Sequence, residues 1–244
     1  MQFVTTVSDS VLSILYPQGC GTCGRGVEKH SLGNTCGDCW NSTRLFRGGE
    51  SLCEKCGSFL SDGCASEPTY CGRCETHEYD KARAVGVYEG AVKDTVLGLK
   101  SSPFVPFGIK VELIAAFERS GFTEADLVVP VPLSAKRFVE RGHNQAAIIA
   151  SIISRKTGIE SDDKALERSI DTPMHRVGMD RKARELTVKK AFHIAHPRLI
   201  DGKAITLIDD VFTTGSTAAA CAKLLKKHGA EKVFVFTLAR AVLY

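Results

Sequence analysis

The sequence contains no run of about 20 apolar residues, so it predicts no membrane span. Its first residues lack a basic segment and a long apolar core, so they do not predict a secretory signal peptide. Aromatic residues make up only 7% of the chain, and no group of them suggests the stacking platform of single-strand nucleic-acid binders. The net charge of +4 permits contact with nucleic acid without arguing for it. We therefore expect a globular, cytoplasmic protein.

Cysteine, by contrast, is abundant in the first third of the chain. Nine of the ten cysteines precede residue 75, and eight of them form four C-x-x-C pairs: Cys20/Cys23, Cys36/Cys39, Cys53/Cys56 and Cys71/Cys74. Two intervening residues let one turn present both sulfurs to one metal, and two such turns complete a tetrahedral site. The segment is poor in large apolar residues, so it needs a metal to fold. Without an export signal, we expect thiols rather than disulfides.

These pairs predict two structural zinc sites. The simplest pairing is sequential, with the first four cysteines on one ion and the last four on the other, but an interleaved arrangement stays open. A redox or iron–sulfur site is a weaker alternative, because a redox C-x-x-C needs one pair and not four. Cys64 lies outside the pairs, and Cys221 is expected in a packed core. The module either supports the rest of the chain or recruits protein or nucleic acid.

After a charged, turn-like stretch, the chain alternates between strand and helix patterns. Strands are predicted at 82–88, 126–131, 204–208 and 232–238, and helices at 91–100, 107–120, 144–157, 178–188 and 218–227. This alternation is typical of a parallel sheet covered by helices, which binds ligands outside the carboxyl ends of its strands. We expect an N-terminal helix and double zinc ribbon over residues 1–77, and an α/β domain over residues 78–244.

Two acids and a loop of small residues follow the apolar strand at 204–208. The acids are Asp209 and Asp210, the loop covers residues 213–217, and a helix pattern comes next. Backbone amides at a helix N-terminus favour a phosphate, and an adjacent acid pair suits hydroxyls or a metal. The combination predicts a sugar-phosphate site. The alternative is an ordinary strand–loop–helix turn in which an Asp caps the helix.

A second strand end carries basic residues. The run Val-Pro-Val-Pro-Leu at 129–133 leads into Lys136, Arg137 and Arg141. Arginine offers a planar fork and lysine a point charge, and both suit a pyrophosphate. The alternative is a solvated, basic helix entry.

Five features occur here in one order: the four C-x-x-C pairs, Leu99-Lys100, the Val-Pro-Val-Pro-Leu run, Arg-Gly-x-Asn-Gln at 141–145 and the Asp-Asp-Val-Phe-Thr-Thr-Gly-Ser-Thr motif at 209–217. In that order they resemble the ComF/GntX family, and the resemblance covers nearly the whole chain. It implies a type I phosphoribosyltransferase-like, parallel-sheet α/β domain preceded by a cysteine-rich double zinc ribbon. It also implies a ligand, 5-phosphoribosyl 1-pyrophosphate (PRPP), that binds with Mg²⁺.

The resemblance also implies roles for individual residues. Asp209 and Asp210 would contact the ribose hydroxyls and act in catalysis, and the 5′-phosphate would bind the loop residues Thr213, Thr214, Gly215, Ser216 and Thr217. The weaker candidates for pyrophosphate binding are Lys100, Arg137 and Arg141. Some family members are linked to DNA uptake in natural competence. Single-stranded DNA and a competence or helicase protein are therefore possible partners.

Three positions depart from the family pattern. His143 stands where Phe is frequent, His175 where Gln is frequent, and Thr187 where Asn is common. We expect both histidines to be packing or surface residues. These changes leave ligand binding credible and the acceptor chemistry open. Two functions follow: a transferase that releases pyrophosphate, or a non-catalytic module that binds a phosphoribosyl ligand, a nucleotide or single-stranded DNA.

Overall fold

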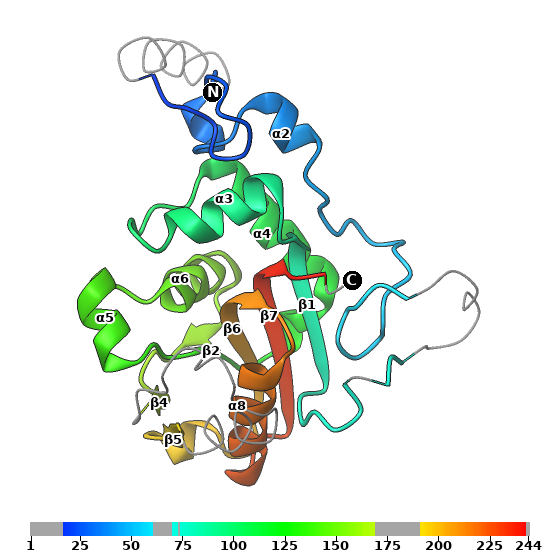
Figure 1. Ribbon diagram of the computed structural model, residues 1–244. Helices are drawn as coiled ribbons and strands as arrows, with labels where there is room; N and C mark the ends of the chain where they lie inside the picture. The colour runs from blue at the N-terminus through cyan, green and yellow to red at the C-terminus, as the bar shows by residue number, and fades with distance from the viewer. Residues whose placement is uncertain (1–16, 61–69, 73, 169–190, 243–244) are drawn as a thin grey trace, which may run out of the picture.

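The computed structural model describes residues 17–60, 70–72, 74–168 and 191–242 (Figure 1). Its centre is a five-stranded sheet in the order β1-β7-β6-β2-β3, in which every neighbouring pair is parallel. The strands are β1 (Lys81–Val87), β2 (Leu127–Pro130), β3 (Glu160–Ser161), β6 (Ala204–Phe212) and β7 (Lys232–Arg240). The expected parallel α/β class with a cysteine-rich module before it is confirmed.

Helices and a small hairpin cover the two faces of this sheet. One face packs on α3 (Gly90–Gly98), α4 (Phe107–Ser120) and α6 (Gln145–Thr157). The other packs on α8 (Ser216–Lys227) and on the antiparallel pair β4 (Leu166–Arg168) and β5 (Phe192–Ile194). Leu207 and Ile208 are both fully buried, in the cores of opposite faces. Burial on both faces explains why the strands are continuous apolar runs and not alternating ones.

The sheet reverses its winding between β2 and β6. From β2 the chain passes through α6 to β3 at one edge, whereas from β6 it passes through α8 to β7 in the opposite direction. The two strands are in register from Leu127↔Ile205 to Pro130↔Ile208, and the amide of Val131 donates to the carbonyl of Ile208 at 2.8 Å. A parallel sheet opens a ligand crevice at such a point, outside the carboxyl ends of the two strands.

The strand that carries the acid pair is longer than the sequence predicts. It was expected to end at residue 208, but β6 continues to Phe212, so both acids lie within the strand. Asp209 pairs with Thr237 of β7, and Phe212 pairs with Arg240. Ladder hydrogen bonds to a central neighbour thus override the low strand propensity of aspartate.

Several short elements were not predicted, because they are too short for a periodic pattern. They are α2 (Gly37–Asn41), α5 (Ala135–Arg141), the strands β3, β4 and β5, and the 3₁₀ turns His30–Leu32, Phe122–Glu124 and Pro197–Leu199. The predicted helix at 178–188 lies outside the described residues, as do Cys64, His175 and Thr187. None of the described helices combines the length and the apolar composition needed to span a membrane.

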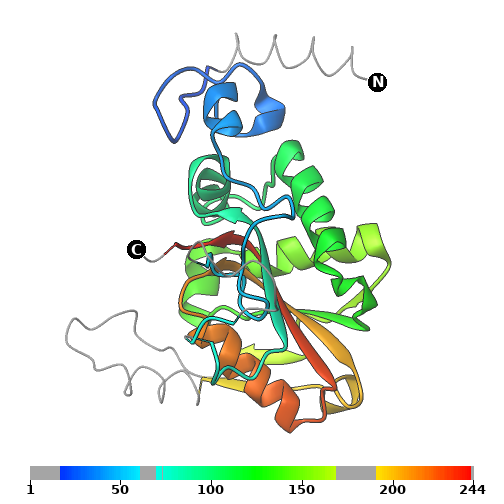
Figure 2. The same cartoon turned by 90° about the vertical axis from the view of Figure 1, so that its right-hand side faces the viewer.

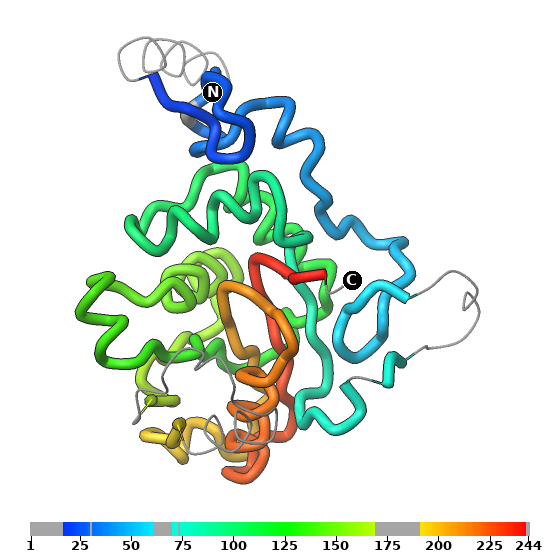
Figure 3. Tube along the Cα trace, viewed as in Figure 1, coloured from blue at the N-terminus to red at the C-terminus, as the bar shows by residue number. Residues whose placement is uncertain are grey.

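Both halves of the cysteine-rich module contact the sheet domain (Figure 3). The first half lies above α3, where the hydroxyls of Thr22 and Thr35 donate to Asp94 at 2.8 and 2.9 Å. The connection to the second half runs antiparallel to β1 (Figure 2), with a bridge between Leu45 and Gly86. The second half then packs beside β1, and its buried cysteines share a core with the sheet.

Candidate functional site

The acid pair lies near the carboxyl end of β6, at the switch point beside β2. Asp209 and Asp210 are both half-buried, and Oδ1 of Asp209 accepts a hydrogen bond from the amide of Asp210 at 2.9 Å. Burial, and then the charge of Asp210, raise the pKa of Asp209 well above its usual range. An ionised Asp209 is therefore costly here unless a ligand supplies hydrogen-bond donors or a cation.

The loop after β6 leads directly into α8. Thr213 and Thr214 are exposed, and the hydroxyls of Thr214 and Ser216 lie 2.8 Å apart. Gly215 is the N-cap residue of α8 and has no side chain to cap it, so the alternative in which an Asp caps the helix is wrong. The hydroxyl of Thr214 accepts a long hydrogen bond of 3.4 Å from the amide of Ser216. An anion can bind at the N-terminal amides of this 12-residue helix.

Gly215 is the one position of this loop where the backbone requires glycine. Its φ is +79°, in the left-handed region. A Cβ atom added there would lie 2.6 Å from the Phe212 ring and 3.2 Å from Cε1 of His77. The rings of Phe212 and His77 therefore pack against the loop at Gly215.

The three basic candidates lie on two segments near the end of β2. Arg137 and Arg141 are half-buried on α5, which follows β2, and Lys100 is exposed just after α3. Nε2 of His143 lies 2.8 Å from the carbonyl oxygen of Leu99, and this contact links the α5–α6 turn to the residue before Lys100. His143 thus makes a packing contact, as expected. The pyrophosphate role of the three cations stays a prediction.

Arg168, at the end of β4, was not among the site residues predicted from the sequence. Its positive charge acts to lower the pKa of Asp209 and that of the buried thiol of Cys221. Its guanidinium also lies 5.4 Å from the centre of the Phe192 ring. Arg168 therefore belongs to the electrostatic surroundings of the acid pair.

The eight paired cysteines form two groups of four, and the pairing is sequential. The first group is Cys20, Cys23, Cys36 and Cys39, and the second is Cys53, Cys56, Cys71 and Cys74. Within each group all four sulfurs lie within 4.8 Å of one another. The interleaved alternative is therefore wrong.

The surroundings of these sulfurs suit a tetrathiolate metal site. The amides of Cys56 and Cys71 point at Sγ of Cys53, at 3.5 and 3.3 Å. Burial raises the pKa of Cys53, but these backbone hydrogen bonds outweigh it and lower the pKa to about 6. In the first group, a hydrogen bond from the Arg25 side chain is the main cause that lowers the pKa of Cys23 to about 6. Burial and the neighbouring sulfurs raise the pKa of Cys39 and that of Cys74, so full deprotonation of each group requires a cation among the four sulfurs. Thiolates are the form that binds zinc, and the four sulfurs of each group fit that ion.

A groove with a volume of about 650 Å³ lies between the two cysteine groups. Trp40, Phe46 and Phe59 line it together with Arg44 and Arg47. The sequence showed no aromatic platform because these rings come from separate segments. Only the folded chain brings them to one groove.

Comparison with protein families and curated proteins gives consistent results. A family model described as a double zinc ribbon domain matches residues 11–75. The chain is 30% identical over 224 residues to competence protein F of Haemophilus influenzae, which covers 88% of this chain and 93% of that protein. It is 29% identical over 214 residues to the DNA utilization protein YhgH of Escherichia coli, with 84% and 91% covered. It is 28% identical over 235 residues to competence protein ComFC of Bacillus subtilis, with 83% and 89% covered.

Solved structures give more distant matches. The glutamine PRPP amidotransferase from B. subtilis, complexed with ADP and GMP, matches with a TM-score of 0.36 and 19% identity, over 69% of this chain and 31% of that one. The chain thus spans about a third of the length of that enzyme. The purine phosphoribosyltransferase from Pyrococcus horikoshii matches with a TM-score of 0.32 and 17% identity, over 54% of this chain and 82% of that one.

Proposed function

Since this chain belongs to the ComF/GntX family, we propose that it binds PRPP with Mg²⁺ at the carboxyl ends of β2 and β6. The observation that carries the proposal is the position of the acid pair. Asp209 and Asp210 lie on β6, which a short loop joins to the N-terminus of α8, at the point where the sheet reverses its winding. A ligand with a phosphate next to hydroxyls fits that arrangement.

Each part of the site takes one part of this ligand. Residues 213–217 and the first amides of α8 bind the 5′-phosphate, and Asp209 and Asp210 accept hydrogen bonds from the ribose hydroxyls. Arg137, Arg141 and Lys100 contact the pyrophosphate. Mg²⁺ bound with PRPP supplies charge neutralisation for that leaving group.

The electrostatics of Asp209 support the same assignment. Because burial and Asp210 raise the pKa of Asp209, the protein without ligand favours its protonated form more than water does. Two hydroxyl donors favour the carboxylate instead, so binding should release a proton. In a transfer reaction, the acid pair would also stabilise positive charge that develops on the ribose as pyrophosphate leaves. The acceptor that attacks the anomeric carbon is left open.

Calorimetric titration with PRPP, with and without Mg²⁺, tests the binding. We expect saturable, Mg²⁺-dependent binding and a proton release that shows as a dependence of the heat on buffer ionisation enthalpy. A pyrophosphate-release screen over nucleobases and amines then tests transfer. Absence of PRPP binding would contradict the proposal, whereas binding without release over all acceptors would favour a module that does not turn over.

A second candidate is a binding module that acts in DNA uptake through its zinc ribbons. The observation that favours it is the groove between the two cysteine groups, where Trp40, Phe46 and Phe59 lie beside two arginines. Bases stack on aromatic rings, and arginine attracts the phosphates. The arginines are paired in the free protein, with Arg44 on Glu89 at 2.7 Å and Arg47 on Glu112 at 2.6 Å, so DNA would have to displace these carboxylates.

The single tryptophan of the chain makes this candidate testable, because Trp40 lines the groove. Titration with oligo(dT) should quench its fluorescence, and Phe59→Ala should weaken the effect. Unchanged fluorescence at saturating oligonucleotide would exclude this groove as a DNA site. The thiols of both groups require a reducing compartment, so we place either function in the cytoplasm.

A further inference from the structure

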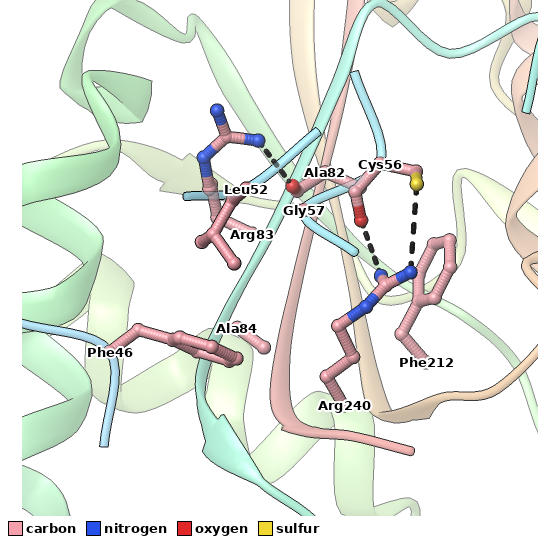
Figure 4. Close-up of a pocket in the computed structure, with 9 residues that line it drawn as sticks. All are labelled: Phe46, Leu52, Cys56, Gly57, Ala82, Arg83, Ala84, Phe212 and Arg240. Atoms are coloured by element: carbon pink, nitrogen blue, oxygen red, sulfur yellow. Dashed lines mark hydrogen bonds between the residues drawn. The ribbon is translucent and has the colours of Figure 1, made fainter. Parts of the chain in front are cut away.

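The second cysteine group is joined to the end of the sheet by a buried arginine. Arg240, the last residue of β7, is 7% exposed. Its guanidinium donates to the carbonyl oxygen of Cys56 and contacts Sγ of Cys56 at 3.6 Å (Figure 4). It also donates to the hydroxyl of Ser58 at 2.6 Å. A buried guanidinium needs negative charge nearby, and a tetrathiolate centre supplies it.

The same guanidinium also contacts the strand that leads into the phosphate loop. Its carbon lies 4.7 Å from the centre of the Phe212 ring, in a cation–π arrangement that Figure 4 shows beside Cys56. Phe212 is the last residue of β6, and its ring lies against Gly215, as the 2.6 Å distance to an added Cβ shows. Arg240 therefore connects Cys56 to Gly215 through one aromatic ring.

A second set of contacts runs from Cys74 to the same glycine. The amide of His77 donates to the carbonyl of Cys74 at 3.1 Å, and Nδ1 of His77 lies 2.8 Å from the Tyr79 hydroxyl. Tyr79 packs edge-on against Phe212 with ring centres 5.9 Å apart, and His77, like Phe212, lies close to the position of an added Cβ at Gly215. Two ligands of the second group, Cys56 and Cys74, are thus connected to one loop by separate contacts.

The junction between the ribbon and the sheet leaves little room for independent motion. The cavity that Arg240, Phe212 and Cys56 line together (Figure 4) has a volume of only about 10 Å³, at most enough for one water molecule. Tightly packed contacts of this kind transmit a displacement instead of absorbing it. The first cysteine group has a different neighbour, because the segment that carries it contacts Asp94 of α3.

We propose that the second cysteine group and the 213–217 loop form one coupled unit, in which Arg240 is the positioning residue. Zinc at that group holds Cys56 and Cys74 in place, and Arg240, Phe212 and His77 then hold the loop in its phosphate-binding shape. Because the coupling of binding free energies between two sites is reciprocal, a phosphate on the loop tightens the binding of that zinc. The ligand side of this inference rests on the proposed PRPP function, but the coupling of metal group and loop does not.

Hydrogen–deuterium exchange of the zinc-loaded protein tests the coupling without any ligand. We expect Arg240→Gln to speed exchange of residues 212–218 by about tenfold, the size of losing one charged hydrogen-bond partner. The matched control is Arg83→Gln. Arg83 is also an arginine that binds the second ribbon, through the Glu54 carbonyl at 3.0 Å, and it lines the same cavity. The Arg83→Gln variant should exchange the amides of the loop at the same rate as the parent.

If Arg240→Gln does not fold, Phe212→Leu replaces it, because this change keeps the ribbon contacts of Arg240 and removes the connecting ring. Equal loop exchange in the Arg240 and Arg83 variants, or in Phe212→Leu and the parent, would overturn the coupling.

The reciprocal effect is measured as the affinity for zinc, by equilibrium competition with a chelator, with and without PRPP. We expect PRPP to tighten the binding of one of the two ions in the parent and to have a smaller effect in Arg240→Gln. Equal tightening in both proteins would overturn the role of Arg240. If the parent binds neither PRPP nor ribose 5-phosphate, the proposed function fails, while the exchange comparison still decides the coupling.

Discussion

Replacing the acid pair by amides separates ligand binding from folding. In the double variant Asp209→Asn/Asp210→Asn, each acid loses the charge that strengthens its hydrogen bond to a ribose hydroxyl. A hydrogen bond to a charged group is worth about 1.5–3 kcal/mol and a neutral one about 0.5–1.5 kcal/mol, so the pair should lose about 2–3 kcal/mol. This corresponds to PRPP binding weaker by roughly 30- to 150-fold. Asparagine is the matched replacement, because its oxygen still accepts the amide of Asp210 that Asp209 accepts at 2.9 Å.

Although the amide variants should bind PRPP more weakly, the Asp209→Asn change should make the free protein more stable. The pKa of Asp209 is raised in the folded state, so the folded protein holds this proton more tightly than the unfolded chain does. Stability is then lost as the pH rises above about 4, the ordinary value for aspartate, towards the raised value. Asp209→Asn removes this penalty, so its melting temperature should exceed that of the parent at pH 7 and approach it at pH 4. The rise should be about 2–4 °C for each kcal/mol removed.

Titration calorimetry measures the first effect, and thermal unfolding between pH 4 and pH 8 measures the second. A double variant that binds PRPP as tightly as the parent would refute the assignment of the acid pair. A melting temperature of Asp209→Asn below that of the parent at pH 7 would refute the electrostatic reasoning. In that case the carboxylate of Asp209 would be a structural acceptor.

Four further predictions concern the metal groups and the phosphate contacts. Elemental analysis should find two zinc ions per chain, and one or none would contradict the two-site interpretation. Cys53→Ser should lower the melting temperature more than Cys23→Ser, because Cys53 is fully buried in the main core and Cys23 is exposed; equal losses would mean that the two ribbons are equivalent. Arg141→Ala should weaken pyrophosphate binding by roughly tenfold and ribose 5-phosphate binding little; equal weakening would make Arg141 a residue that supports the fold. Gly215→Val should abolish phosphate binding and destabilise the loop by at least 1 kcal/mol, about the cost of a strained left-handed residue; normal binding by that variant would place the phosphate elsewhere.

The metal-binding turns and the phosphate loop could be predicted from the sequence, because each depends on residues that are neighbours along the chain. The C-x-x-C spacing sets turns that present two sulfurs, whatever the rest of the protein does. The apolar strand before Asp209 and the small residues at 213–217 likewise predict a strand end followed by an anion-binding helix start. The sequence also predicted the parallel sheet, because strands and helices alternate.

Everything that depends on which segments meet was decided by the tertiary structure. The sequence left the zinc pairing open, because both arrangements use the same turns. It ended the acid-bearing strand too early, because hydrogen bonds to β7 extend β6 to Phe212. The roles of Arg168 and Arg240 could not be predicted, because their partners lie in distant segments of the chain. Arg168 acts on the acid pair, and Arg240 contacts Cys56 and Phe212. Spacing along the chain specifies what each turn can bind, and only the packing of strands and ribbons specifies which turns act on the same ligand.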